Sequence, residues 1–214
     1  MNAKRLIGAY LTLWAIFVFT SSCGKKEEKL DLGTMQGALY KNNYFRLTVK
    51  IPEAWHVQDN ETKKKLMAQA SRIAAGGDEK LRDRLDASAL DSVNLLTVLQ
   101  YPAGTPVDYN PVFLVMADKV GSWINRGSDY LMNTKAVLEK TKMSISFVDG
   151  ISSETVGGVT FDTMETRIKT PKLPVTQKYY VTIKKGYALV IIVSYAADKE
   201  SQALNGIIQS INFQ

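Results

Sequence analysis

The C-terminal half of the chain holds strand-length segments joined by very short turns. Met143, Ile145 and Phe147 recur with period two, which is the repeat of a β-strand, and strand-length segments follow at 159–169, 175–184 and 187–195. Gly157-Gly158 and Lys185-Gly186 interrupt this pattern at positions suited to hairpin turns. Because strands joined by such short turns must pair antiparallel, the sequence predicts a mainly antiparallel sheet.

Two segments are apolar on both faces, which indicates strands in the middle of a sheet. Residues 189–193 are Leu-Val-Ile-Ile-Val, and Val93 to Tyr101 is similarly apolar. Such strands need cover on both sides of the sheet. The neighbouring sequence supplies it in helical patterns, so we expect an α/β (α+β) fold in which helices sandwich the mainly antiparallel sheet.

Apolar residues at helical spacing predict where the helices lie. The first helix is expected to begin with Asn60 as its cap and to end at Gly76-Gly77. Asn110-Pro111 suits another helix start, because proline is favoured at the first helical position, and an apolar stripe that includes Trp123 continues to Ile124. The other helices are expected at Lys80–Ala89, at Tyr130–Leu138, and after Asp198 as a cap.

The N-terminal residues have the order of a secretory targeting segment. Lys4-Arg5 precede the uncharged run Leu6–Phe19, and Thr20-Ser21-Ser22 lead to Cys23. A membrane-spanning helix needs roughly 20 apolar residues, whereas about 10 to 14 suit a signal-peptide core. The segment resembles the lipobox of bacterial lipoproteins, with Thr20 where that motif usually has leucine. The resemblance implies cleavage before Cys23, a palmitate-type lipid anchor on its thiol, and a place in the bacterial cell envelope.

Two alternatives to a lipoprotein remain open. One is an uncleaved N-terminal anchor helix that ends in a chance cysteine, and the other is soluble secretion. On the lipoprotein hypothesis the chain divides into a signal peptide (1–22), a flexible tether (23–35) and a single globular domain (36–214). Cys23 is the only cysteine, so the domain has no disulfide and no metal site built on a cysteine cluster.

The positive charge does not indicate a nucleic-acid partner. The formal net charge is +6, and Lys4 and Arg5 of the predicted signal peptide contribute two of those charges. Proteins that bind nucleic acid gather their basic residues on one face or helix. Lys63-Lys64-Lys65 is the densest basic group, and we expect it at the solvated start of a helix, with weak attraction to anionic lipid headgroups as the alternative.

No residue pattern indicates catalysis or cofactor binding. His56 is the sole histidine and is expected at a solvated strand edge rather than in a catalytic triad or zinc site. Asp83 and Asp86 alternate with arginines, which is typical of a solvated helix face. Asp149-Gly150 is a turn signal, and no glycine-rich phosphate-binding loop occurs. We therefore predict that the chain is not an enzyme and has no catalytic residue, cofactor or metal.

A series of spaced segments resembles the Mog1/PsbP-like fold, including small bacterial lipoproteins of the DcrB type. The segments are Ile51-Pro52 followed by Trp55, Gly157-Gly158-Val159, Gln177–Tyr180, Gly186–Leu189 and Ile207–Phe213. The resemblance covers about residues 36–214 and implies a non-catalytic binding scaffold. No functional residue carries over, because members of that group bind different partners through different surfaces, and fold does not fix function.

Four tyrosines on the predicted C-terminal strands are candidates for an interaction surface. Any of Tyr179, Tyr180, Tyr187 and Tyr195 that project outward would form an aromatic contact patch; the alternative is packing against a covering helix. Our leading hypothesis is a lipid-anchored protein that binds another envelope protein. The second is a carrier of a small apolar ligand, and the third is a hydrolase with an unrecognised carboxylate site.

Overall fold

The computed structural model describes residues 29–89 and 92–214, so the predicted signal peptide and Cys23 lie outside the described residues. The strands are β1 (Thr34–Gln36), β2 (Leu39–Asn42), β3 (Leu47–Lys50), β4 (His56–Val57), β5 (Ser92–Leu99), β6 (Val112–Lys119), β7 (Ser144–Val156), β8 (Val159–Lys169), β9 (Val175–Lys184), β10 (Tyr187–Tyr195) and β11 (Asn212–Phe213). The helices are α1 (Asn60–Ala75), α2 (Glu79–Ala89), α3 (Gly127–Leu138) and α4 (Asp198–Gln209).

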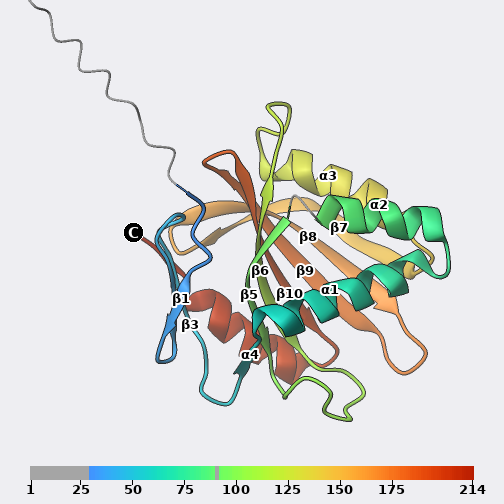
Figure 1. The fold of residues 1–214 in the computed structure, drawn as a ribbon, viewed down its shortest axis with the longest axis horizontal. Helices are drawn as coiled ribbons and strands as arrows, with labels where there is room; N and C mark the ends of the chain where they lie inside the picture. The colour runs from blue at the N-terminus through green and yellow to red at the C-terminus, as the bar shows by residue number, and fades with distance from the viewer. Residues whose placement is uncertain (1–28, 90–91) are drawn as a thin grey trace, which may run out of the picture.

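The strands of the described residues form two antiparallel sheets. The large sheet has the order β4-β5-β6-β10-β9-β8-β7, and the small sheet has the order β1-β2-β3-β11. The hairpins predicted at Gly157-Gly158 and Lys185-Gly186 join β7 to β8 and β9 to β10. Strand β10 lies between β6 and β9 near the middle of the large sheet (Figure 1). The predicted mainly antiparallel sheet and the central position of this strand are confirmed.

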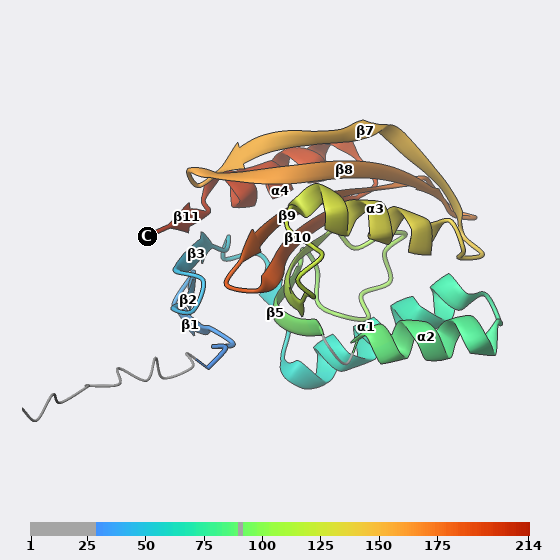
Figure 2. The same ribbon diagram turned by 90° about the horizontal axis from the view of Figure 1, so that it is seen from above.

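Each face of the large sheet carries its own apolar core. On one face, Leu131 of α3 packs with Tyr179, Val181 and Val190, and Met67 of α1 packs against the same cluster. On the other face, α4 and the small sheet cover Tyr180 and its neighbours. Figure 2 shows α3, α1 and α2 on a different side of the sheet from α4. The α+β sandwich is therefore confirmed, with a second sheet assisting the helix on one side.

The segment after Asn110-Pro111 is strand β6, so the predicted helix there is wrong. Its apolar residues fit helical spacing, but a fully buried strand also carries apolar residues on both faces. Asn110 does not cap a helix; its side chain donates to the Tyr101 carbonyl over 2.8 Å and accepts from the Tyr101 N–H over 3.0 Å. This pair closes the loop between β5 and β6 and aligns the two strands.

Strand β7 continues through Asp149-Gly150, where a turn was predicted. The pairing with β8 shifts between Val148 and Ser152, and Asp149 adopts φ 51°. These are the features of a β-bulge, which inserts extra residues into a strand without ending it. The Asp149-Gly150 pair therefore does change the course of the backbone, but it forms a bulge within β7 instead of a turn that ends the strand.

Two helix starts lie one residue earlier than predicted. Asp59, rather than Asn60, caps α1, and its carboxylate accepts from the Thr62 N–H over 2.7 Å. Ala197 is the cap residue of α4 rather than Asp198, and the Glu200 carboxylate accepts from its N–H over 3.1 Å. In each case a carboxylate near the start satisfies backbone donors that the first helical turn leaves open.

The segment before β1 is bound to the domain. The buried Asn42 donates from Nδ2 to the Asp31 carbonyl over 2.7 Å, and the Tyr40 hydroxyl donates to the Leu32 carbonyl over 2.9 Å. Leu30 packs against the core. The tether predicted to run to residue 35 is therefore corrected at its C-terminal end, because the chain is already packed on the domain at Leu30.

Within residues 29–89 and 92–214, no helix is both long enough and apolar enough to cross a membrane.

Candidate functional site

A short ordered loop between β6 and α3 presents Trp123 to solvent. The Ile124 N–H donates to the Gly121 carbonyl over 3.1 Å, and the Ile124 side chain is buried below the turn. Trp123 is 69% exposed. A side chain at Gly121 would lie 2.7 Å from the indole Nε1, so the missing Cβ lets the ring rest over the loop. The loop thus holds a large aromatic ring outward on a buried anchor.

The start of α3 fixes the other end of this loop. The Asp129 carboxylate accepts from the N–H groups of Asn125 and Arg126, each over 3.0 Å. These two backbone donors lower the pKa of Asp129. The Ser128 N–H also donates to the Asp162 carboxylate over 2.8 Å, which ties the helix start to β8. The position of Trp123 is therefore set by bonds on both sides.

A hollow of about 400 Å³ lies beside Trp123, and we call it the α3 groove. Its apolar walls are Val120, Trp123, Ile124, Val137 and Leu138, and its polar residues are Ser92, Asp118, Lys119, Tyr130, Asn133 and Thr134. Val137 is 43% exposed. Two large apolar side chains of the groove wall, Trp123 and Val137, therefore face solvent. Single exposed apolar residues are normal, whereas contiguous exposed apolar surface is typical of interaction sites, so the α3 groove is a candidate for one.

Tyr130 fixes the floor of the α3 groove. Its hydroxyl donates to the Asp118 carboxylate. Burial and the neighbouring Asp118 charge raise the pKa of Tyr130, so the phenol keeps its proton. Because Asp118 lies on β6 and Tyr130 on α3, the bond fastens the helix to the sheet next to the groove.

A second hollow, which we call the α1–β5 groove, has a volume of about 520 Å³. One wall is formed by residues of α1, namely Asn60, Lys63, Lys64, Met67, Ala68 and Ser71. The rest of the lining consists of Leu32, Asp86, Ser92, Val93, Asn94 and Met116. Lys64 and Ala68 are exposed, so the groove opens to solvent along α1. Ser92 lines both grooves, which places them next to one another on the same side of the large sheet.

Lys63 is a polar group within this apolar groove, whereas the sequence predicted it in a solvated basic cluster. It is half-buried, and its Nζ donates to the Leu95 carbonyl over 3.1 Å. Burial lowers the pKa of Lys63, an effect partly offset by the Asp59 carboxylate. The prediction of a solvated Lys63-Lys64-Lys65 cluster holds for Lys64 and Lys65, which are exposed.

Comparison with known proteins gives structural likenesses at low identity. No protein-family model and no curated protein matches the sequence. PsbP (CyanoP) from Synechocystis sp. PCC 6803 is similar, with 12% identity and a TM-score of 0.49 over 86% of this chain and 99% of that one. LpqN of Mycobacterium tuberculosis, which is involved in cell envelope biogenesis, has 12% identity and a TM-score of 0.44 over 78% and 82%. The immunity protein TplEi from Pseudomonas aeruginosa has 8% identity and a TM-score of 0.41 over 83% and 97%.

A PsbP structure is thus among the chains similar to this one. The spaced sequence segments had resembled a Mog1/PsbP-like fold. What these proteins bind or take part in is a property of those proteins, because likeness at this level concerns the course of the chain and not its surface.

The four predicted tyrosines do not share one surface. Tyr179 and Tyr180 are 7% and 2% exposed and lie on opposite faces of β9, each inside one of the two cores. Tyr187 and Tyr195 are half-buried and pack against the core that contains Tyr180. The interaction surface proposed for these residues therefore remains a prediction for Tyr187 and Tyr195 alone.

The buried tyrosines predict a loss of stability at alkaline pH. Burial raises the pKa of Tyr40 and of Tyr179 from 10.0 to about 12. The unfolded chain releases these protons near pH 10 and the folded protein near pH 12, so the stabilisation is complete below pH 10 and is lost between these values. We expect the unfolding free energy to fall by on the order of 2 to 3 kcal/mol per tyrosine across this window.

Urea unfolding at about pH 9 and about pH 11.5 measures this fall. Tyr179→Phe keeps the ring in the core and removes the titrating group, so the slope of stability against pH should be smaller in that variant. Identical slopes in the variant and the wild type would contradict the role given to this phenol.

The remaining polar candidates of the sequence lie at the surface. His56 is exposed on β4 at the edge of the large sheet, as predicted. Asp83 and Asp86 are exposed on α2, also as predicted, although Asp86 additionally lines the α1–β5 groove. Among the residues that the structure describes, no group of three or more His, Cys, Asp or Glu side chains is placed to hold a metal ion.

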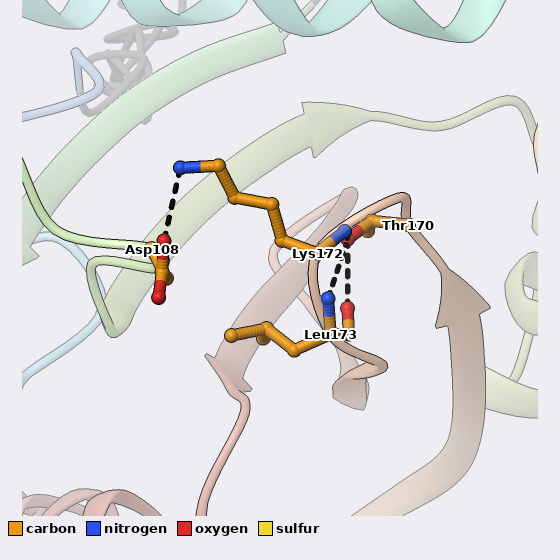
Figure 3. A network of polar contacts seen from close by, with 4 residues as sticks. All are labelled: Asp108, Thr170, Lys172 and Leu173. Atoms are coloured by element: carbon orange, nitrogen blue, oxygen red, sulfur yellow. Dashed lines mark hydrogen bonds and ion pairs between the residues drawn. The ribbon is translucent and has the colours of Figure 1, made fainter.

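A third hollow, at the ends of β7 and β8, has no buried polar group. Its volume is about 610 Å³, and its cationic side chains Arg167, Lys169 and Lys172 are all exposed. Beside it, the Thr170 hydroxyl donates to the Leu173 carbonyl over 2.7 Å, and Lys172 pairs with Asp108 over 2.9 Å (Figure 3). Such an exposed ion pair contributes about 0 to 1 kcal/mol, so this network shapes a loop rather than a binding site.

Proposed function

We propose that this protein is a lipid-anchored, non-catalytic component of the bacterial cell envelope that binds another envelope protein through the α3 groove. In this proposal residues 1–22 are a signal peptide, Cys23 carries the lipid, and a short tether leads to the domain at about Leu30. Support for the anchor comes from the order of charges, apolar residues and small residues before Cys23.

The observation that carries the binding surface is the exposure of Trp123 on an ordered loop. Tryptophan is enriched among the residues that contribute most to protein–protein affinity, because its large ring fills a pocket on the partner. The loop bonds around Ile124 and Asp129 hold the backbone that carries Trp123 in place before a partner arrives. A loop that is already ordered loses less entropy on binding.

Removing the indole should reduce partner binding without unfolding the domain. We expect Trp123→Ala to lower recovery of one envelope protein by about tenfold or more, which is the usual effect of losing a central aromatic residue. The measurement is quantitative mass spectrometry of proteins that copurify with the full chain from gently solubilised membranes.

Met132→Ala is the matched control for this experiment. Met132 is another large apolar side chain exposed on α3, and it does not line the α3 groove. Recovery of the same protein should be unchanged in this variant, and thermal unfolding should show that both variants are folded. The proposal is overturned if no recovered protein depends on Trp123, or if both variants lose it equally.

The α1–β5 groove favours a second candidate function, carriage of a small apolar ligand. Its volume of about 520 Å³ lies in the range of ligand sites, and apolar side chains converge there with a few polar groups. The third candidate, a hydrolase with a carboxylate site, finds no comparable support. Backbone N–H groups lower the pKa values of the Asp59 and Asp129 carboxyl groups, which is the opposite of what a general acid needs.

A further inference from the structure

We propose that the α1–β5 groove binds a single acyl chain with an anionic headgroup, with the chain along Met67 and Met116 and the headgroup at Lys63 and Lys64. The inference rests on the second candidate function, ligand carriage, and gives that ligand a chemical class. It is independent of partner binding at Trp123.

The shape of the groove suits an elongated ligand. Its lining residues follow one face of α1 from Asn60 to Ser71, a distance of about 16 Å at 1.5 Å per residue. The middle of this face carries Met67 and Ala68, and Met116 and Val93 lie on the sheet side. Methionine side chains adapt to irregular apolar ligands because they are unbranched and polarizable.

The charges of the groove select an anionic headgroup over a neutral one. Lys63 and Lys64 are at the N-terminal half of the α1 wall. Among the described residues, Lys65 pairs with Glu61 over 2.7 Å, whereas neither Lys63 nor Lys64 has a carboxylate within 4.0 Å. An ammonium group has three donors, so Lys63 keeps two after its bond to the Leu95 carbonyl. Asp86 is the acidic side chain of the lining, which leaves one net positive charge among the lining residues; Asp59, whose carboxylate acts on Lys63, lies outside the lining.

The groove also opens close to where the chain leads to the predicted anchor. Leu32 lines the groove and is nine residues after Cys23, a separation of at most about 30 Å in an extended chain. A lipid-anchored domain would therefore hold the groove near the membrane, where single-chain amphiphiles are released and taken up. This position favours a free membrane-derived amphiphile as the occupant.

Photolabelling of the full chain in membranes tests the inference. The probe is dodecanoate with a diazirine on its chain, and the matched neutral probe is the corresponding dodecanol. We expect saturable labelling of peptides from α1 and β5 by the carboxylate probe, competed by dodecanoate, and labelling about tenfold weaker with the alcohol.

Two pairs of variants separate the groove from its surroundings. Ala68→Trp fills the groove and should reduce labelling by about tenfold or more, whereas Ala70→Trp adds the same ring to an exposed position outside the lining and should not. Lys64→Gln should raise by about fivefold the dodecanoate concentration that halves the labelling. Lys65→Gln removes the same charge one residue away and should leave this concentration unchanged.

Equal labelling by both probes, or labelling that survives Ala68→Trp, overturns the inference. If only the Cys23→Ser variant is labelled, the chain's own acyl group occupies the groove and the free ligand is excluded. Trp123→Ala should leave labelling unchanged. Failure of labelling with Trp123-dependent partner recovery intact therefore overturns this inference alone, and the reverse result overturns the protein-binding function alone.

Discussion

Replacing Cys23 with serine should abolish the lipid modification and leave the protein either released from the membrane or unprocessed. Each buried methylene of an acyl chain contributes about 0.8 kcal/mol, and two or more chains hold a protein stably where one does not. A serine hydroxyl does not replace the thiol in the thioether to diacylglycerol. Intact-mass measurement of the chain and fractionation of cells give the readout: the acyl mass disappears, and the protein is either soluble or left unprocessed.

Ser22→Ala is the control for this substitution, because it keeps a small residue before the cut and keeps the thiol. It should retain both the acyl mass and the membrane fraction. If Cys23→Ser partitions fully with membranes and shows the same mass as the wild type, the protein is not a lipoprotein of this kind, and an uncleaved anchor helix becomes the better account.

Replacing Gly127 with alanine should cause the largest loss of stability from a single added methyl group. Gly127 is the first residue of α3, and a Cβ there would lie 2.2 Å from the Val181 carbonyl oxygen and 3.1 Å from Asp162 Cβ. Backbone atoms of β9 cannot move aside cheaply, so α3 must shift. We expect a loss of about 3 kcal/mol, the upper end for an overpacked site, and a fall of roughly 5 to 10 °C in Tm.

Gly206→Ala in α4 is the matched control and should act in the opposite direction. A Cβ at Gly206 meets nothing within 4 Å. Alanine in a helix interior is favoured over glycine by about 0.5 to 1 kcal/mol. Thermal unfolding of the two variants should therefore show opposite shifts. Equal or stabilising effects at Gly127 would mean that α3 does not rest on β9 as closely as described.

The antiparallel sheet could be predicted because its turns are local in sequence. Gly157, Gly158 and Gly186 adopt positive φ values of 57°, 80° and 79°, a conformation that glycine reaches without a steric penalty. Each turn fixes which strands are neighbours, and the alternating apolar residues fix which face is buried. The closing helix could be predicted for the same reason, since Leu204, Ile207 and Ile208 form one buried stripe.

Strand β6 could not be distinguished from a helix by its own residues. Val112, Val115 and Met116 satisfy helical spacing, and they also suit a strand that is covered on both faces. What decides the outcome is pairing with β5 and β10, which are distant in sequence. The small strands β1 and β2 were missed because their pairing depends on Asn42 and Asp31 holding the N-terminal segment.

The candidate site was predicted least well, since it depends on how elements meet. Trp123 was placed on the buried stripe of a helix that does not form, and the structure exposes it on a loop. Gly121 and Gly127 on either side were the sequence signal for such a loop. Conversely, Tyr179 and Tyr180 were candidates for a surface but are buried, because both faces of β9 are covered. Lys63 gave no signal that set it apart from Lys64 and Lys65.

The most direct test of partner binding is photocrosslinking from the rim of the α3 groove in intact cells. A benzophenone amino acid placed at residue 137, which is exposed, lines the α3 groove and leaves Trp123 in place, should give one discrete crosslinked envelope protein. The same amino acid at residue 132, which is exposed on α3 outside the α3 groove, should not. Absence of a product from residue 137, or the same products from both positions, would contradict a domain whose role is contact with a partner through this groove.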